Sequence, residues 1–422
     1  MNKKVILYPV VAMALIMSVM GASVYAADEP EYKGQFSYKV SASESGKSFE
    51  STESGKNAIL VTGGTVNFSK SIITKSGDGA GGMNTDYYGT DAAVLAIKSS
   101  KIKLMDSTVT TRGKRSDAIF SYGDSTIDAS DSIITTEKDS SSALTVTAGG
   151  TIFATNLVVE AKGKSPLMYF GKGGGSMEIT NGTYKATGSK SPMVLIQPEA
   201  SAKETTDVDI KLEKIALDNG SDGLIKIDST NQGRNRKNGA NVTVSAMKTA
   251  LAGNITADEI SSLTMMLSKR TELIGSINKD KKAKNVTLMI DQTSRVVLTA
   301  DSYVKSLKNS GPGNSNIYAN GHKLFVDGRE AKINTAKYED WEYDFDTETT
   351  EPIKPQAATK EVKKDKSGLY ILLGVSGAAF LISLSSVIFL VKRSRNRAQR
   401  QKEQEVIAKA SSNSMKKPWE RV

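Results

Sequence analysis

Four stretches of twelve residues decide the fold of this chain: SKIKLMDSTVTT at 100–111, STIDASDSIITT at 125–136, GTIFATNLVVEA at 150–161 and GSMEITNGTYKA at 175–186. Each stretch starts 25 residues after the previous one, and apolar and polar residues alternate within it. A repeat of this length is typical of solenoids, in which successive units stack on one another. Because each unit holds three short alternating segments, it has no room for a helix, and we expect strands throughout.

Apolar residues fall into three columns when the units are aligned. The first column contains Val66, Ile102, Ile127, Ile152 and Met177. The second, seven residues later, contains Ile73, Val109, Ile134, Val159 and Tyr184, and the third, eight residues before the first, contains Ala58, Val94, Ile119, Leu144 and Tyr169. A polar column between the first two contains Asp106, Asp131, Asn156 and Asn181, with Lys70 as the exception. These columns predict an all-β parallel β-helix, in which coils stack about 4.8 Å apart and Asp or Asn form the turns.

The repeat continues in a looser form toward the C-terminus. Val242, Leu263 and Val286 recur at steps of 21 and 23 residues. The Asn-Gly pair within 317–324 predicts a hairpin that caps the last coil, with His322 exposed beside the turn. The competing fold, a propeller or an antiparallel sandwich, would need Asn-Gly hairpins between the strands, and these are mostly missing.

The two ends of the chain predict its location. Residues 1–26 have a basic start, an apolar run and small residues before Ala27, as in a secretory signal peptide. Residues 369–391 carry no charge and are long enough to span a bilayer as one transmembrane helix, and the basic residues that follow favour a cytoplasmic tail at 392–422. We therefore expect a single-pass cell-membrane protein with an extracellular β-helix at 27–330 and an acidic, Pro- and Lys-containing stalk at 331–368.

Charge and composition exclude several classes of protein. The formal net charge is +10, but the predicted tail carries ten Lys and Arg against three Asp and Glu, and Lys3 and Lys4 contribute two more positive charges. The predicted body is therefore close to neutral, and nucleic acid is not an expected partner. The chain has no cysteine and one histidine, which excludes disulfides, thiolate metal sites and cysteine nucleophiles.

The units such as Ser125–Thr135, the turn Gly149–Ile152 and the signal peptide together resemble pectin-lyase-like β-helix surface proteins of Gram-positive bacteria, many of them adhesin-like. The resemblance covers roughly residues 50–330. It implies a right-handed parallel β-helix displayed on the cell surface. The partners that it implies are cell-wall or host glycans, matrix, or another surface protein.

Polysaccharide lyases and hydrolases share this fold and give an alternative function. Enzymes that resemble polygalacturonase need an Asn-Thr-Asp, an Asp pair and a Gly-His-Gly on neighbouring coils. Residues 84–86 match the first element, but the chain has no Asp-Asp pair, and its only histidine lies in the predicted cap. A calcium-dependent lyase would need stacked carboxylates, whereas the aspartates of the turn column change to asparagine in the next units. We therefore predict no catalytic residue, no metal and no cofactor.

Two features are candidates for binding. The first is the 11-residue insertion at 79–89, a Gly-rich loop in which we expect Asn84, Asp86, Tyr87 and Tyr88 to contact a sugar or a protein. The second is a basic edge at one turn of successive coils, formed by Arg112, Lys114, Arg115, Lys162, Lys164 and Lys190. The edge suits anionic polymers. The alternatives are a passive loop and a solvated edge that prevents aggregation.

These observations predict a membrane-anchored adhesion or surface-interaction module. A polysaccharide-active enzyme and a structural wall spacer without a ligand remain the alternatives.

Overall fold

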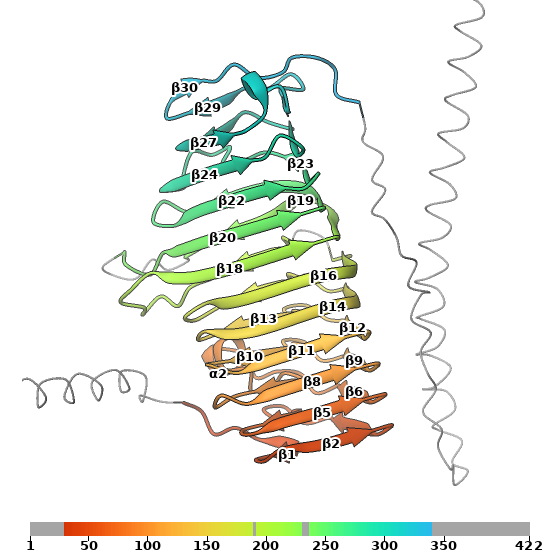
Figure 1. Cartoon of the computed structure of the whole chain (residues 1–422). Coiled ribbons are helices and arrows are strands. Elements are labelled where there is room, and N and C mark those ends of the chain that lie inside the picture. Colours follow the sequence, from red (N-terminus) through yellow and green to blue (C-terminus); the bar gives the residue numbers. More distant parts are fainter. Residues whose placement is uncertain (1–28, 189–190, 230–235, 340–422) are drawn as a thin grey trace, which may run out of the picture. The chain divides into compact units, whose positions relative to one another are not determined.

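The structure, a computed structural model, describes residues 29–188, 191–229 and 236–339. Within this part, 27 strands form one sheet in which every pairing between strands is parallel, and Figure 1 shows the strands stacked as successive rungs. A sheet of this kind is the arrangement of a β-solenoid, as the repeat predicts. The predicted signal peptide, transmembrane span and tail lie outside the described residues. No helix among the described residues has the length and apolar character needed to cross a membrane.

The strands form three columns, and in the first four coils each column has a strand of its own. The first column begins with β1 Gly34–Tyr38, β4 Asn57–Val61, β7 Val94–Ala96, β10 Ile119–Tyr122, β13 Leu144–Thr147, β15 Met168–Phe170 and β17 Val194–Ile196. The second contains β2 Ala42–Ser45, β5 Thr65–Ser69, β8 Lys101–Met105, β11 Thr126–Ser130, β14 Gly150–Ala161, β16 Gly175–Ala186, β18 Thr206–Glu213, β20 Ala240–Met247, β22 Ser262–Ser268, β24 Asn285–Ile290 and β27 Ser306–Asn309.

The third column adds the last strand of each coil. Its members are β3 Ser48–Ser51, β6 Ile72–Lys75, β9 Thr108–Thr111, β12 Ile133–Thr136, β19 Ala216–Ile227, β21 Ala250–Ala257, β23 Glu272–Gly275, β25 Arg295–Leu298 and β28 Ile317–Tyr318. The long strands β14 and β16 run through the bend and serve both the second and the third column. In the same way β19 pairs with β16 at Leu217 and with β17 at Ile225, so it serves both the third and the first column. The remaining elements are α2 Met83–Tyr88, η1 Pro312–Asn314, β26 Ser302–Val304, β29 Leu324–Val326 and β30 Arg329–Glu330.

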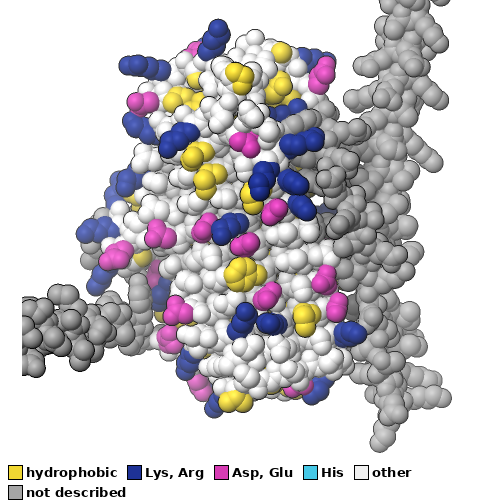
Figure 2. Space-filling view, in the orientation of Figure 1, with side chains coloured by type: hydrophobic (Ala, Val, Ile, Leu, Met, Phe, Trp, Pro, Cys, Tyr) yellow, Lys and Arg dark blue, Asp and Glu magenta, His cyan; other side chains and the backbone are white. Residues whose placement is uncertain are grey.

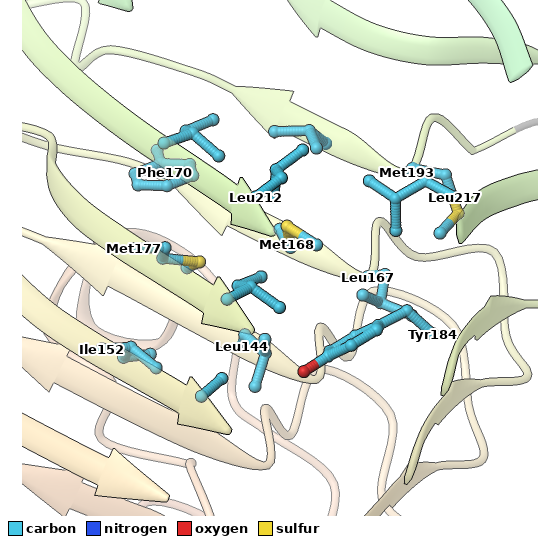
Figure 3. Close-up of a cluster of buried hydrophobic side chains, with 14 of the residues drawn as sticks. Leu144, Ile152, Leu167, Met168, Phe170, Met177, Tyr184, Met193, Leu212 and Leu217 are labelled. Carbon is cyan, nitrogen blue, oxygen red and sulfur yellow. The ribbon is translucent and has the colours of Figure 1, made fainter. Parts of the chain in front are cut away.

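The apolar columns predicted from the sequence are in register in the structure. Ile127 is paired with Ile102 below and Ile152 above, and the second column is paired in the same way from Ile73 to Tyr184. These side chains are at most 3% exposed and meet in the interior, part of which is drawn in Figure 3. Stacking of identical positions therefore builds the core of the solenoid.

The third predicted column is wrong at its two ends. Ile59, and not Ala58, pairs with Val94. Met168, and not Tyr169, pairs with Leu144. The shifts arise where the coil length departs from 25 residues. One place is the insertion, across which Val66 pairs with Ile102, and the other lies between β13 and β15, where Leu144 pairs with Met168. As a consequence, Tyr169 occupies an outward position of its strand.

The polar column forms the turn between the second and third strands of a coil. All of its members have a left-handed backbone, with φ between 48° and 56° at Lys70, Asp106, Asp131, Asn156 and Asn181. Asp and Asn tolerate this conformation better than other residues. The Asn156 amide also donates to Asp131 at 2.7 Å, so neighbouring coils are linked at the turn. Lys70 adopts the same turn and is no structural exception.

The C-terminal cap differs from the predicted hairpin. β28 pairs in parallel with β25, and the antiparallel hairpin is formed instead by β29 and β30 around Asp327-Gly328. The chain after β30 still packs on the last coil, because Asn334 forms a bridge with Tyr318 and Tyr338 Oη donates to Glu272 at 2.6 Å. His322 is half-buried beside the Asn-Gly turn, where we expected an exposed residue. The region assigned to the stalk therefore starts with residues that belong to the cap.

Candidate functional site

The 79–89 insertion contains the helix α2, which packs on the outer face of the first strand column beside β10 (Figure 1). Gly82 and Gly89, both with positive φ, bound the helix. The buried carboxylate of Asp91 fixes the segment, since it accepts the Thr85 hydroxyl at 2.8 Å, the Ala80 N–H at 3.3 Å and the Gly55 N–H at 2.5 Å. The insertion is therefore a helix packed on the outer face of the strands, and not the Gly-rich loop that the sequence predicts.

Tyr88 belongs to the interior of this flank. It is 6% exposed, and its ring lies 5.4 Å from that of Tyr122, which in turn lies 6.4 Å from that of Tyr32. Lys172 donates to the Tyr88 hydroxyl at 2.6 Å and lies 4.5 Å from the centre of its ring. Because these contacts occupy both the ring and the hydroxyl, Tyr88 supports the flank and is not a free contact for a ligand.

The other predicted residues of the insertion are accessible to different degrees. Asn84 is exposed, whereas Asp86 and Tyr87 are half-buried. The Tyr87 ring lies against Gly171, where an added Cβ would come within 3.0 Å of a ring carbon. Its carbonyl accepts the Thr147 hydroxyl at 2.8 Å. The helix therefore presents Asn84 and the outer edges of Asp86 and Tyr87 from a fixed platform.

Stacking brings Asp117 from β10's coil and Tyr169 from β15 to the same flank. Asp117 accepts the Ser142 N–H at 2.7 Å and the Thr145 hydroxyl at 2.6 Å. Burial raises the pKa of Asp117 to about 7, and the nearby charges of Asp86 and Asp91 act in the same direction against these two hydrogen bonds. We call the surface formed by Asn84, Asp86, Tyr87 and Asp117, together with the buried side chain of Tyr169, the α2 flank.

Burial also shifts the other titrating groups of the α2 flank. The pKa of Asp86 is raised by desolvation, and the positive charge of Arg115 opposes that shift. Desolvation raises the pKa of Tyr169 well above its usual value, with added contributions from Tyr87, Asp86 and Asp117. The α2 flank therefore combines aromatic surface with carboxyl groups that lie close enough to influence one another.

The basic edge is interrupted by acidic residues of the same and neighbouring coils. Arg112 lies 3.8 Å from Glu137, and Lys162 lies 3.8 Å from Glu160. The backbone N–H of Lys164 donates to Asp139 at 2.9 Å, and that of Lys114 to Asp78 at 2.8 Å. Arg115 is half-buried beside the insertion, with its guanidinium next to Gly81. Lys190 lies outside the described residues. The described part of this edge is therefore a row of alternating charges.

The residues that the sequence interpretation missed are Asp117, Tyr122, Tyr169 and Lys172. Their position in the repeat could have identified them, because each occupies an outward position on or beside the first strand column. In this part of the column α2 covers a neighbouring coil. No cluster of three or more His, Asp or Glu side chains that could hold a metal ion occurs among the described residues.

The fold defines the class of protein as a β-solenoid. Comparisons with protein-family models, with curated proteins and with solved structures found no match to this chain.

Proposed function

We propose that this chain is a membrane-anchored extracellular β-solenoid that acts as an adhesion or surface-interaction module. A signal-peptide-like N-terminus and an uncharged segment at 369–391 followed by basic residues support this location. The partner would be a cell-wall or host glycan, matrix, or another surface protein. The contact surface would be the α2 flank.

One observation carries the assignment of the surface: the insertion that interrupts the regular repeat forms a fixed helix with accessible polar and aromatic groups. Insertions in repeat proteins often lie on the binding face. Tyr87 offers a rigid ring edge and a hydroxyl, with Asn84 and Asp86 on the same short helix. Aromatic surface held in one orientation loses little entropy on binding, and this favours a role in recognition.

The change Tyr87→Ala is expected to weaken binding by about fivefold to thirtyfold, because a rigid aromatic contact contributes about 1–2 kcal/mol. The full-length chain would be applied to an array of bacterial and host glycans and to immobilised matrix proteins. Tyr87→Phe keeps the packing against Gly171 and serves as the control for stability. Retention of wild-type binding by Tyr87→Ala, combined with its loss after reversal of Arg112 and Lys114 to glutamate, would assign binding to the basic edge instead.

The membrane topology can be tested on intact cells. Protease added from outside to wall-stripped cells should remove the solenoid and leave 392–422 intact, because the basic residues from Lys392 to Arg400 favour a cytoplasmic position. A tag placed after Val422 reports on the protected fragment. Digestion of that tag without permeabilising the cells would contradict the proposed orientation.

A second candidate function, cleavage of a glycosidic bond, is favoured by Asp117. A carboxyl group with a pKa near 7 can act as a general acid at neutral pH, and Asp86 is a neighbouring carboxylate. A reducing-end assay on the glycans that the array identifies separates the two functions. Release of reducing ends that is lost in Asp117→Asn favours an enzyme, whereas binding without release favours an adhesion module.

We also infer that the solenoid is a right-handed β-helix of the pectin-lyase-like type. Three strands per coil and a left-handed residue between the second and third strands support this inference, and crossovers between parallel strands are right-handed in almost all proteins. A crystal structure with left-handed coils would contradict it.

A further inference from the structure

The outward face of the second strand column carries a regular grid of side chains, and this face lies toward the viewer in Figure 2. The strands β8, β11, β14, β16 and β18 follow one another in register along this face. Their central outward residues are Lys103, Asp128, Phe153, Glu178 and Lys211. An aromatic ring is therefore flanked by one carboxylate on each side and by one lysine beyond each carboxylate.

Phe153 is one of few large hydrophobic side chains among the described residues that remain exposed, with 40% of its surface accessible. Hydroxyl groups flank it in two rows, one from Thr126, Thr151 and Ser176 and the other from Ser130, Thr155 and Thr180. Thr151 and Ser176 lie within hydrogen-bond distance of each other at 3.1 Å. Asp128 and Glu178 are each one rung, about 4.8 Å, from Phe153.

We propose that Phe153 and the groups around it form a binding site for a neutral glycan chain. The C–H face of a pyranose ring would pack on the phenyl ring, as apolar surfaces pack on aromatic faces elsewhere. Hydroxyl groups at the edge of the sugar would donate to Asp128 and Glu178, while the threonine and serine hydroxyls accept or donate. The site lies on a different strand column from the α2 flank and does not rest on the function proposed for that flank.

The charge pattern discriminates between possible occupants. The carboxylates lie one rung from Phe153 and the lysines two rungs away, so a uronate packed on the ring meets Asp128 and Glu178 first, although Glu178 also lies 3.6 Å from Lys211. A two-fold dimer centred on Phe153 would place carboxylate opposite carboxylate and ammonium opposite ammonium, because the order of charges is the same in both directions from the ring. Like charges held opposite one another oppose association. An uncharged sugar, which needs acceptors and an aromatic face, meets neither penalty.

The test uses cellohexaose as a neutral probe, because all its ring substituents are equatorial and each ring offers a flat C–H face. Binding to the full-length chain would be measured by calorimetry in a detergent without a sugar headgroup. Hexagalacturonate is the acidic probe of the same length. We expect cellohexaose to bind, hexagalacturonate to bind at least tenfold more weakly, and Phe153→Ala to weaken cellohexaose binding at least tenfold.

Met105→Ala is the matched control, because Met105 lies on the same face with the same 40% exposure and away from the central row. The affinity of Met105→Ala for cellohexaose should stay within twofold of wild type, and both variants should melt at the wild-type temperature.

Equal binding of cellohexaose by Phe153→Ala and wild type overturns the proposal, as does the absence of binding to wild type. Loss of binding in Tyr87→Ala alone would place the sugar on the α2 flank, so that this proposal fails while the proposed function stands. A wild-type dimer that Phe153→Ala converts to a monomer would identify the face as an interface between copies and would also overturn it.

Discussion

Replacing Ile127 by aspartate is expected to lower the free energy of unfolding by about 4 kcal/mol or more. Ile127 is 0% exposed and is stacked between Ile102 and Ile152 in the apolar interior. The substitution removes apolar burial and introduces a carboxylate among aliphatic side chains, where it finds neither a cation nor a donor. Urea unfolding of the full-length chain, followed by circular dichroism, measures the effect.

Two further variants test whether the loss of stability depends on the inward position of residue 127. Ile127→Val removes one methylene and should cost about 1 kcal/mol, which keeps the test informative if Ile127→Asp does not fold. Asp128→Asn changes the next residue, which points outward, and should leave the urea midpoint unchanged. Wild-type stability of Ile127→Asp would show that position 127 does not face the core.

The regular part of the fold was predictable because stacking repeats the same environment at the same position of each coil. The column from Ile102 to Met177 needs no long-range information, since a period of 25 residues is visible in the chain itself. The ends of the third column were displaced by one residue because a period cannot be followed through a change in coil length, an insertion before Val94 and a shorter step between Leu144 and Met168. Ile59 and Ala58 are both apolar and both buried, so composition does not decide between them.

The helix α2 could not be predicted from its own residues. Its six residues lie between glycines, a composition typical of a loop. The helix is held in place by tertiary contacts, namely the Asp91 carboxylate and the burial of Tyr88 under Lys172. Contacts between residues as far apart as 88 and 172 depend on the stacking of coils, and a single sequence does not show which outward residues meet.

Asp117 was missed for the same reason, since the sequence does not show which residues the stacked coils bring around it. Its titration provides a strong test of the α2 flank. The ordinary pKa of an aspartate is about 3.9, whereas burial raises that of Asp117 to about 7 in the folded chain. The folded state therefore retains a proton that the unfolded state loses as the pH rises from about 4 to about 7. Stability contributed by this group is fully present below about pH 4, decreases over that interval, and stays at its lower value above it.

Asp117→Asn removes this penalty and is expected to stabilise the protein at pH 8 by about 2–3 kcal/mol. The full difference between the two pKa values corresponds to about 4 kcal/mol, and the weaker hydrogen bonds from Ser142 and Thr145 to a neutral amide reduce the gain. At pH 4 the variant and the wild type should unfold at nearly the same urea concentration. Asp124→Asn, at an exposed position two residues after Tyr122, is the control and should show no difference at either pH. A difference between Asp117→Asn and wild type that stays constant from pH 4 to pH 8 would show that Asp117 titrates normally, and would remove the basis for a general acid on the α2 flank.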